Sequence, residues 1–123
     1  MDSVKRDIAE SKRMAQIAVD ALSAKKAEDI RVIDISDVSS LGDYFIIASG
    51  GSRPQLEAMR DEVDEKLSRE GFEVRSIEGG DGAKWILMDY GDIVVHIFDR
   101  ENRLFYDLER IWRDGKEVDI ENI

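Results

Sequence analysis

The sequence predicts a single α/β domain with a mixed five-stranded sheet and three helices. Three segments have apolar residues at helical spacing, at about residues 3–27, 53–69 and 101–114. Short runs rich in β-branched and aromatic residues lie between them. Two of these runs flank an acidic, glycine-containing turn, which is the pattern of an antiparallel hairpin.

Composition limits the class of protein and of partner. The 123 residues suffice for one domain, which we expect to span residues 1–123. The chain has no cysteine and one histidine, which excludes disulfides, thiolate metal sites and multi-histidine metal sites. No apolar run approaches the roughly 20 residues of a membrane span, and the N-terminus has no signal-peptide core, so we expect a cytoplasmic protein.

The net charge of −10 points to a protein partner. Binding to a nucleic acid backbone requires Lys and Arg side chains that displace counterions. The chain has 28 acidic and 18 basic residues, and it has no long stretch rich in Lys and Arg. A basic protein is therefore the expected partner, with little direct nucleic-acid contact.

The first half of the chain predicts a helix followed by two strands. The stripe of Val4, Ile8, Ala15, Ala18 and Leu22 indicates a helix over about residues 3–27. Residues 30–35 form the first expected strand. Residues 44–49 are apolar on both faces, which is typical of a central strand.

The second helix has clear start and stop signals. Ser52 and Gln55 have the spacing of a capping box, and Pro54 suits a first helical turn. The helix is expected to run to about Arg69, with Gly71 as its C-terminal stop. Its inward positions are Leu56, Met59, Val63 and Leu67.

Residues 72–77 are the third expected strand, and residues 85–99 form the hairpin. With Tyr90 and Gly91 as the turn, Asp89 lies opposite Asp92, and the two faces of the hairpin differ. One face is aliphatic and predicts core: Ile86, Met88, Ile93, Val95 and Ile97. The other holds Trp85, Leu87, Val94, His96 and two carboxylates, a composition suited to a contact surface.

The element order is therefore α-β-β-α-β-β-β-α. The passage from the second strand through the second helix should be a parallel crossover, and the hairpin makes the sheet mixed. Residues 1–12 and 115–123 are expected to be mobile. Three helices do not cover both faces of five strands, so we expect the Trp85/His96 face to stay partly open.

Three features allow a chemical and a structural interpretation. The turn at residues 50–52 opens a helix and could bind phosphate, but it lacks the P-loop lysine and the dinucleotide glycine spacing. Asp89 and Asp92 could hold a divalent metal, or simply favour a turn. His96 could act as a general base, although no serine or carboxylate has a matching position, so a hydrogen-bonded structural role is favoured.

The aromatic residues also allow two interpretations, packing in the core or contact with a partner. Tyr106 and Trp112 on the last expected helix suit packing better than contact. Trp85 is as compatible with an interface as with the core, because tryptophan is enriched among interface hot spots. From these residues alone we expect an acidic α/β domain with a protein-binding sheet face.

Several motifs resemble the Iojap-type ribosomal silencing factors. The similarity covers about residues 14–112, with its motifs in the family's order. They are Lys26-Ala27-Glu28-Asp29-Ile30, residues 43–50 with Ser52, Glu78-Gly79, Trp85, Asp89-Tyr90-Gly91-Asp92, residues 95–98, and Arg103 with Tyr106, Leu108-Glu109 and Trp112.

The resemblance implies a nucleotidyltransferase-like fold without transferase activity, and we expect no metal and no cofactor. It also implies binding to the large ribosomal subunit through its ribosomal protein fourteen, which would block subunit joining and repress translation when nutrients are short. The contact residues implied are Trp85, Leu87, Asp89, Tyr90, Asp92 and His96.

Two alternatives remain open at this point. One is a nucleotide-binding enzyme that uses the turn at residues 50–52 with Asp89, Asp92 and a metal. The other is a homodimeric adaptor for another basic protein, since an apolar face left open also favours self-association.

Overall fold

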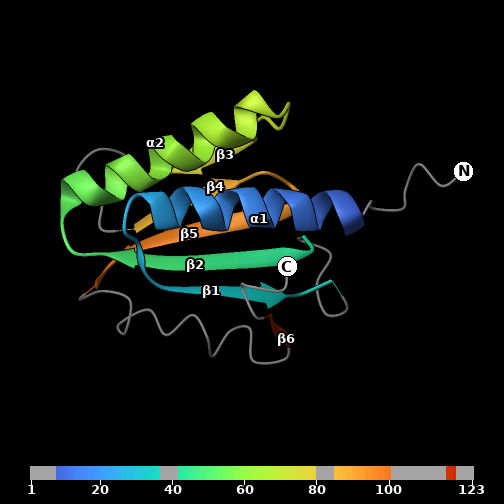
Figure 1. The fold of residues 1–123 in the computed structure, drawn as a ribbon, viewed down its shortest axis with the longest axis horizontal. Coiled ribbons are helices and arrows are strands. Elements are labelled where there is room, and N and C mark those ends of the chain that lie inside the picture. The colour runs from blue at the N-terminus through green and yellow to red at the C-terminus, as the bar shows by residue number, and fades with distance from the viewer. Residues whose placement is uncertain (1–7, 37–41, 80–84, 101–115, 119–123) are drawn as a thin grey trace, which may run out of the picture.

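The computed structural model describes residues 8–36, 42–79, 85–100 and 116–118. In this part of the chain the strands form one sheet in the order β3-β4-β5-β2-β1-β6 (Figure 1). The α/β class and the mixed sheet are confirmed, with six strands in place of five. The elements are α1 (Ile8–Ala24), β1 (Glu28–Asp34), β2 (Tyr44–Gly50), α2 (Arg53–Arg69), β3 (Ser76–Glu78), β4 (Trp85–Asp89), β5 (Ile93–Asp99) and β6 (Lys116–Val118).

The hairpin strands β4 and β5 lie in the sheet between β2 and β3, the two strands that α2 connects. β2 pairs in parallel with β5, while β4 pairs antiparallel with both β5 and β3. β3 therefore runs in the same direction as β2, as the predicted crossover requires, but two strands separate them. β1 completes the centre by pairing antiparallel with β2.

Both described helices pack on the same face of the sheet (Figure 1). The core between them and the sheet takes its side chains from α1, α2 and alternate positions of the strands. The five aliphatic hairpin residues predicted to face the core all lie in it and are fully buried: Ile86, Met88, Ile93, Val95 and Ile97.

The opposite face of the sheet is less open than expected. It carries a second buried apolar cluster of Ile33, Ile35, Phe45, Ile47, Val94 and Phe98. Trp85 and Leu87 pack at its margin and stay partly exposed. The difference has a simple reason. Side chains on the central strands β5 and β2 have neighbours on both sides, whereas those on β4 have β5 on one side and only the three-residue β3 on the other. On this face β4 keeps Trp85, Leu87 and Asp89 partly exposed, and its neighbour β3 is exposed.

α1 ends three residues earlier than predicted. Lys26 adopts φ +62°, and the N–H groups of Lys26 and Ala27 donate to the carbonyls of Ser23 and Leu22. This is a Schellman motif formed without glycine, so the sequence carried no C-terminal signal for it. At the other end, residues 8–12 belong to the helix, and the predicted helical residues 3–7 lie outside the described residues.

α2 begins and ends as predicted. Ser52 is the N-cap, and its Oγ accepts from the Gln55 N–H at 3.3 Å. Gly71, at φ +90°, ends the helix, and the N–H of Phe72 returns to the carbonyl of Leu67 at 2.9 Å. The four predicted inward residues are all buried.

The third strand is shorter than predicted and lies further along the chain. It covers Ser76–Glu78 instead of residues 72–77. Ser76 pairs with Asp89, where β4 ends, so the residues before Ser76 have no strand opposite them. Phe72 and Val74 instead pack against the helix-side core.

The C-terminal segment also differs from the prediction. Residues 116–118, expected to be a loose tail, form β6 and pair antiparallel with β1. Three residues are too few for an alternating pattern to be recognised, and the free edge of β1 supplies the hydrogen bonds. The predicted helix at residues 101–114, with Tyr106 and Trp112, lies outside the described residues.

Candidate functional site

All six predicted contact residues lie on the β4–β5 hairpin. Its turn consists of Gly91 and Asp92, since the N–H of Tyr90 donates to the Ile93 carbonyl with an N···O distance of 3.0 Å. Gly91 has φ +87°. A two-residue hairpin with a positive φ at its first turn position favours glycine there, because a side chain would be strained.

The prediction that Tyr90 and Gly91 form the turn is wrong by one residue. Asp89 pairs with Val94 and not with Asp92, so the pairing differs from the predicted one by two residues. Side chains alternate with a period of two, and a displacement by two leaves each side chain on its predicted face. The faces predicted for the strand residues are therefore confirmed, whereas Asp92 lies in the turn and not on a strand.

The carboxylate of Asp89 has a conformational role at this turn. Its Oδ1 accepts from the Gly91 N–H at 2.8 Å. The backbone carbonyl of Asp92 accepts from the Asp43 N–H at 2.7 Å, which fastens the turn to the start of β2. Within the described residues, no three His, Cys, Asp or Glu side chains are grouped so as to hold a metal ion.

Tyr90 lies on the helix side of the sheet and is 6% exposed. Its hydroxyl donates to Oδ1 of Asp64 in α2 at 3.0 Å. Burial, and then the neighbouring Asp64 carboxylate, raise the pKa of the phenol above its ordinary value. Tyr90 thus connects the hairpin to α2, and the structure does not bring it together with Trp85.

An aromatic cluster occupies the opposite face of the hairpin. Trp85 and Phe98 are directly paired, and their rings lie 6.1 Å apart at 9°. His96 lies on β5, which runs between β4 and β2. Its ring is 6.3 Å from that of Trp85 at 7°, and edge-on to Phe45 at 5.5 Å. The indole Nε1–H donates to Nδ1 of His96 over 3.4 Å. His96 is 5% exposed, so it lies beneath the surface rather than on it.

Burial lowers the pKa of His96 to about 4, which makes the domain less stable in acid. The unfolded chain takes up a proton near pH 6.5, while the folded chain resists it until about pH 4. The free energy of unfolding should therefore fall by about 2 kcal/mol between pH 7 and pH 5. Urea unfolding followed by circular dichroism at each pH measures this fall.

The His96→Phe variant is the control, because it keeps an aromatic ring and removes the titrating group. Its unfolding free energy should be nearly constant over the same pH range. An equal fall in the variant and in the unmodified chain would assign the pH dependence to other groups.

The partly exposed side chains form a strip along β4, which we call the β4 surface. It consists of Trp85, Leu87 and Asp89 together with their β3 neighbours Ser76 and Glu78, which pair with Asp89 and Leu87. Glu78 is exposed and adds an acid beside an apolar residue. Sequence reasoning missed this contribution, because the predicted third strand ended before Glu78. Asp92, also partly exposed, lies at the turn end.

The glycine turn at residues 50–52 is used for helix capping. The Gly51 N–H donates to Oε1 of Gln55 at 2.8 Å, and the amide of Gln55 donates to the carbonyls of Lys25 and Lys26 at the end of α1. A side chain at Gly51 would meet the guanidinium of Arg100, with 2.7 Å between the added Cβ and Nη2. The Gly51 N–H, one donor that could have bound a phosphate, is thus used by Gln55, whose side chain joins the two helices.

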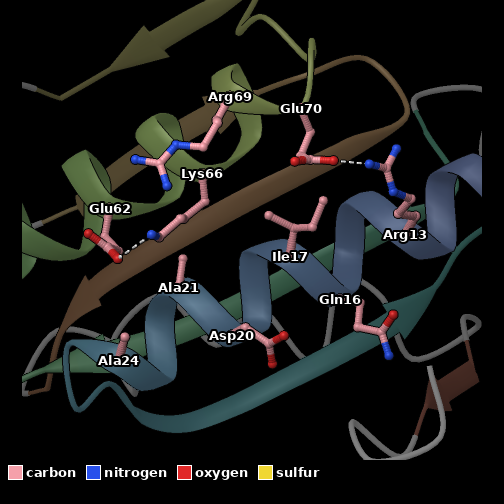
Figure 2. Close-up of a pocket in the computed structure, with 10 residues that line it drawn as sticks. All are labelled: Arg13, Gln16, Ile17, Asp20, Ala21, Ala24, Glu62, Lys66, Arg69 and Glu70. Carbon is pink, nitrogen blue, oxygen red and sulfur yellow. Dashed lines mark hydrogen bonds and ion pairs between the residues drawn. The ribbon is translucent and has the colours of Figure 1, made fainter.

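A groove of about 440 Å³ lies between α1 and α2 (Figure 2). Ile17 and Ala21 point into it from α1. Ion pairs border it, with Arg13 joined to Glu70 and Lys66 to Glu62. The groove contains none of the six predicted contact residues.

Comparisons with known proteins agree on one family. The profile described as "Ribosomal silencing factor during starvation" matches residues 8–123. The chain is 38% identical over 110 residues to the ribosomal silencing factor RsfS of Bacillus subtilis, which covers 89% of this chain and 93% of that protein. A mouse relative named mitochondrial assembly of ribosomal large subunit protein 1 is 34% identical over 97 residues, or 76% of this chain and 42% of that protein.

A solved structure has the same fold. The crystal structure of a Chromobacterium violaceum protein superposes with a TM-score of 0.80 at 34% identity, covering 87% of this chain and 88% of that one.

In the part of the chain that the structure describes, no helix has the length and apolar character needed to cross a membrane.

Proposed function

The chain belongs to the family of ribosomal silencing factors, and from this premise we propose that it binds the large ribosomal subunit and prevents the small subunit from joining. Translation would fall as a result, in conditions of nutrient shortage, in the cytoplasm where the ribosomes work. The family's description supports silencing during starvation. The mouse relative's name connects that protein with the large subunit, which favours the same partner here.

The β4 surface carries this proposal. Trp85 on β4 is partly exposed, with apolar Leu87 beside it and the acids Asp89 and Glu78 alongside. Such an arrangement offers an aromatic anchor surrounded by charge, which is how binding energy is concentrated at many protein interfaces. Asp92 at the turn extends the acidic margin. The four predicted residues that reach solvent are Trp85, Leu87, Asp89 and Asp92.

The other two predicted contact residues, Tyr90 and His96, are buried below this surface. Tyr90 holds the hairpin to α2 through Asp64, and His96 lies beneath Trp85. Neither exposes enough of its side chain to supply much contact area, since they are 6% and 5% exposed. We therefore assign them supporting roles.

Charge favours a ribosomal protein over ribosomal RNA as the direct contact. The net charge of −10 repels phosphate backbones, whereas a basic ribosomal protein is attracted to Asp89, Asp92 and Glu78. Ribosomal protein fourteen of the large subunit, implied by the family resemblance, is the partner we propose. In the free protein, the same apolar residues Trp85 and Leu87 would support a homodimer.

We also propose that the chain acts by binding and not by catalysis. The Gly51 N–H, a donor that a phosphate-binding turn would need, donates to the side chain of Gln55, and the Ser52 Oγ accepts from the Gln55 N–H. Asp89 is engaged at the hairpin turn. These contacts support a binding protein with no metal or cofactor of its own.

Sedimentation with purified subunits tests the partner. The protein should pellet with isolated large subunits and stay in solution with isolated small subunits, because only the former carries the proposed site. Its binding should weaken as salt increases, since screening reduces the attraction between the acidic surface and a basic partner. Equal binding to both subunits, or to neither, would contradict the proposal.

A further inference from the structure

We infer that His96 is a positioning residue that holds the Trp85 indole in its binding orientation without touching the partner. The inference rests on the proposed function, in which Trp85 is the anchor. It assigns the only histidine of the chain a role distinct from the surface contact that its place in the motif implies.

The strand pairing places the two side chains next to each other. Trp85 is directly opposite Phe98, and His96 is directly opposite Leu87, so the indole and the imidazole are diagonal neighbours on one face. Side chains at such positions are within reach when one of them is large. The indole Nε1–H is directed at Nδ1 of His96, with 3.4 Å between the nitrogens.

The rings around His96 fix the imidazole in turn. The imidazole lies 6.1 Å from the Phe98 ring at 2° and 6.3 Å from the indole at 7°, so three rings are nearly parallel. Phe45 from β2 meets the imidazole edge-on, at 75° and 5.5 Å. Offset-parallel and edge-on arrangements at these separations are both favourable. His96 therefore has little freedom to turn away from the indole.

Burial separates the roles of the two residues. His96 is 5% exposed and Trp85 is partly exposed, so a partner on this face meets the indole. The low pKa of the buried imidazole keeps it neutral at neutral pH, and Nδ1 can then accept a hydrogen bond. An aromatic side chain held in its bound orientation loses less freedom on binding, and we expect this preorganisation to strengthen binding by about 3- to 10-fold.

The first test uses the unmodified protein. Because the chain has one histidine, a long-range ¹H–¹⁵N spectrum reports its tautomer without ambiguity. We expect the proton on Nε2 and an unprotonated Nδ1, together with a Trp85 indole N–H that is shifted downfield and exchanges slowly. A spectrum with the proton on Nδ1 would overturn the inference.

Two variants then separate the hydrogen bond from ring packing. His96→Asn keeps an acceptor near the position of Nδ1, whereas His96→Phe keeps a stacking ring and loses the acceptor. We expect His96→Phe to move the indole N–H resonance upfield and weaken large-subunit binding by about 3- to 10-fold. His96→Asn should retain the resonance and most of the affinity.

The outcomes distinguish this inference from the proposed function. Wild-type resonance and affinity in His96→Phe, or weaker binding with an unchanged resonance, would overturn the positioning role. A His96→Phe variant that does not fold would also overturn it, in favour of a purely structural histidine. If unmodified protein and Trp85→Ala bind the large subunit equally, the proposed site fails, whatever the spectrum of the free protein shows.

Discussion

Replacing Val95 with aspartate is expected to unfold the domain. Val95 is fully buried on the helix side of the sheet, between Met88 of β4 and Ile46 of β2. A carboxylate there would lose its hydration without a partner, or would have to be protonated. Either cost takes several kcal/mol from a domain whose total stability is expected to be about 5–15 kcal/mol. Thermal melts followed by circular dichroism should show no cooperative transition.

The Val95→Ala variant is the matched control, because it shortens the same side chain without adding charge. It should lose only about 2 kcal/mol, from the removed methyl groups and the cavity they leave, and should melt cooperatively at a lower temperature. A wild-type melt for Val95→Asp would contradict the assignment of this face as core.

The Trp85→Ala variant is expected to lose large-subunit binding while staying folded. Removing a central aromatic anchor costs about 2–4 kcal/mol of binding free energy, which weakens binding by roughly 30- to 1,000-fold. The fold should survive, because Trp85 lies at the margin of its cluster and is partly exposed. Sedimentation measures the affinity, and far-UV circular dichroism with a melt measures the fold.

A change of charge tests the same surface independently. Asp92→Lys places a cation at the turn and should weaken binding to a basic partner by repulsion. Asp61→Lys, in α2 on the other side of the sheet, makes the same charge change away from the β4 surface and should leave binding nearly unaltered. Equal losses in both variants would point to net charge instead of this surface. If Trp85→Ala unfolded the chain and Val95→Asp did not, the two faces would be assigned the wrong way round.

Elements with strong local signals were predictable from the sequence. α2 has a capping serine, a proline in its first turn and a glycine stop, and its observed bounds match the prediction. β2 is apolar at nearly every position and is central and fully buried, as expected. Local backbone chemistry decides these features, so the sequence alone contains them.

Features that depend on a partner strand were not predictable. The extent of β3 is set by where β4 ends, and β6 exists because the edge of β1 is free to pair. The end of α1 depends on Lys26 adopting a positive φ, which residue type does not signal. Boundaries of this kind are decided by tertiary contacts.

Within the site, the choice of turn residues had the largest consequence. Placing Tyr90 in the turn hid the fact that it continues the alternation of β4 and therefore faces the helices with Met88. Strand alternation extended by one residue would have found this. The burial of His96 was harder to foresee, because it depends on Phe45 from the neighbouring strand β2 as well as on Phe98, two residues along β5.

Subunit joining is the most direct test of the proposed mechanism. Purified large and small subunits are mixed at a magnesium concentration that favours joining, with the protein in excess, and are separated on a sucrose gradient. The joined ribosome peak should shrink and the two free-subunit peaks should grow, with no such shift when the Trp85→Ala variant is added. An unchanged profile, at a protein concentration that saturates the large subunit, would contradict the claim that this chain silences ribosomes by blocking their assembly.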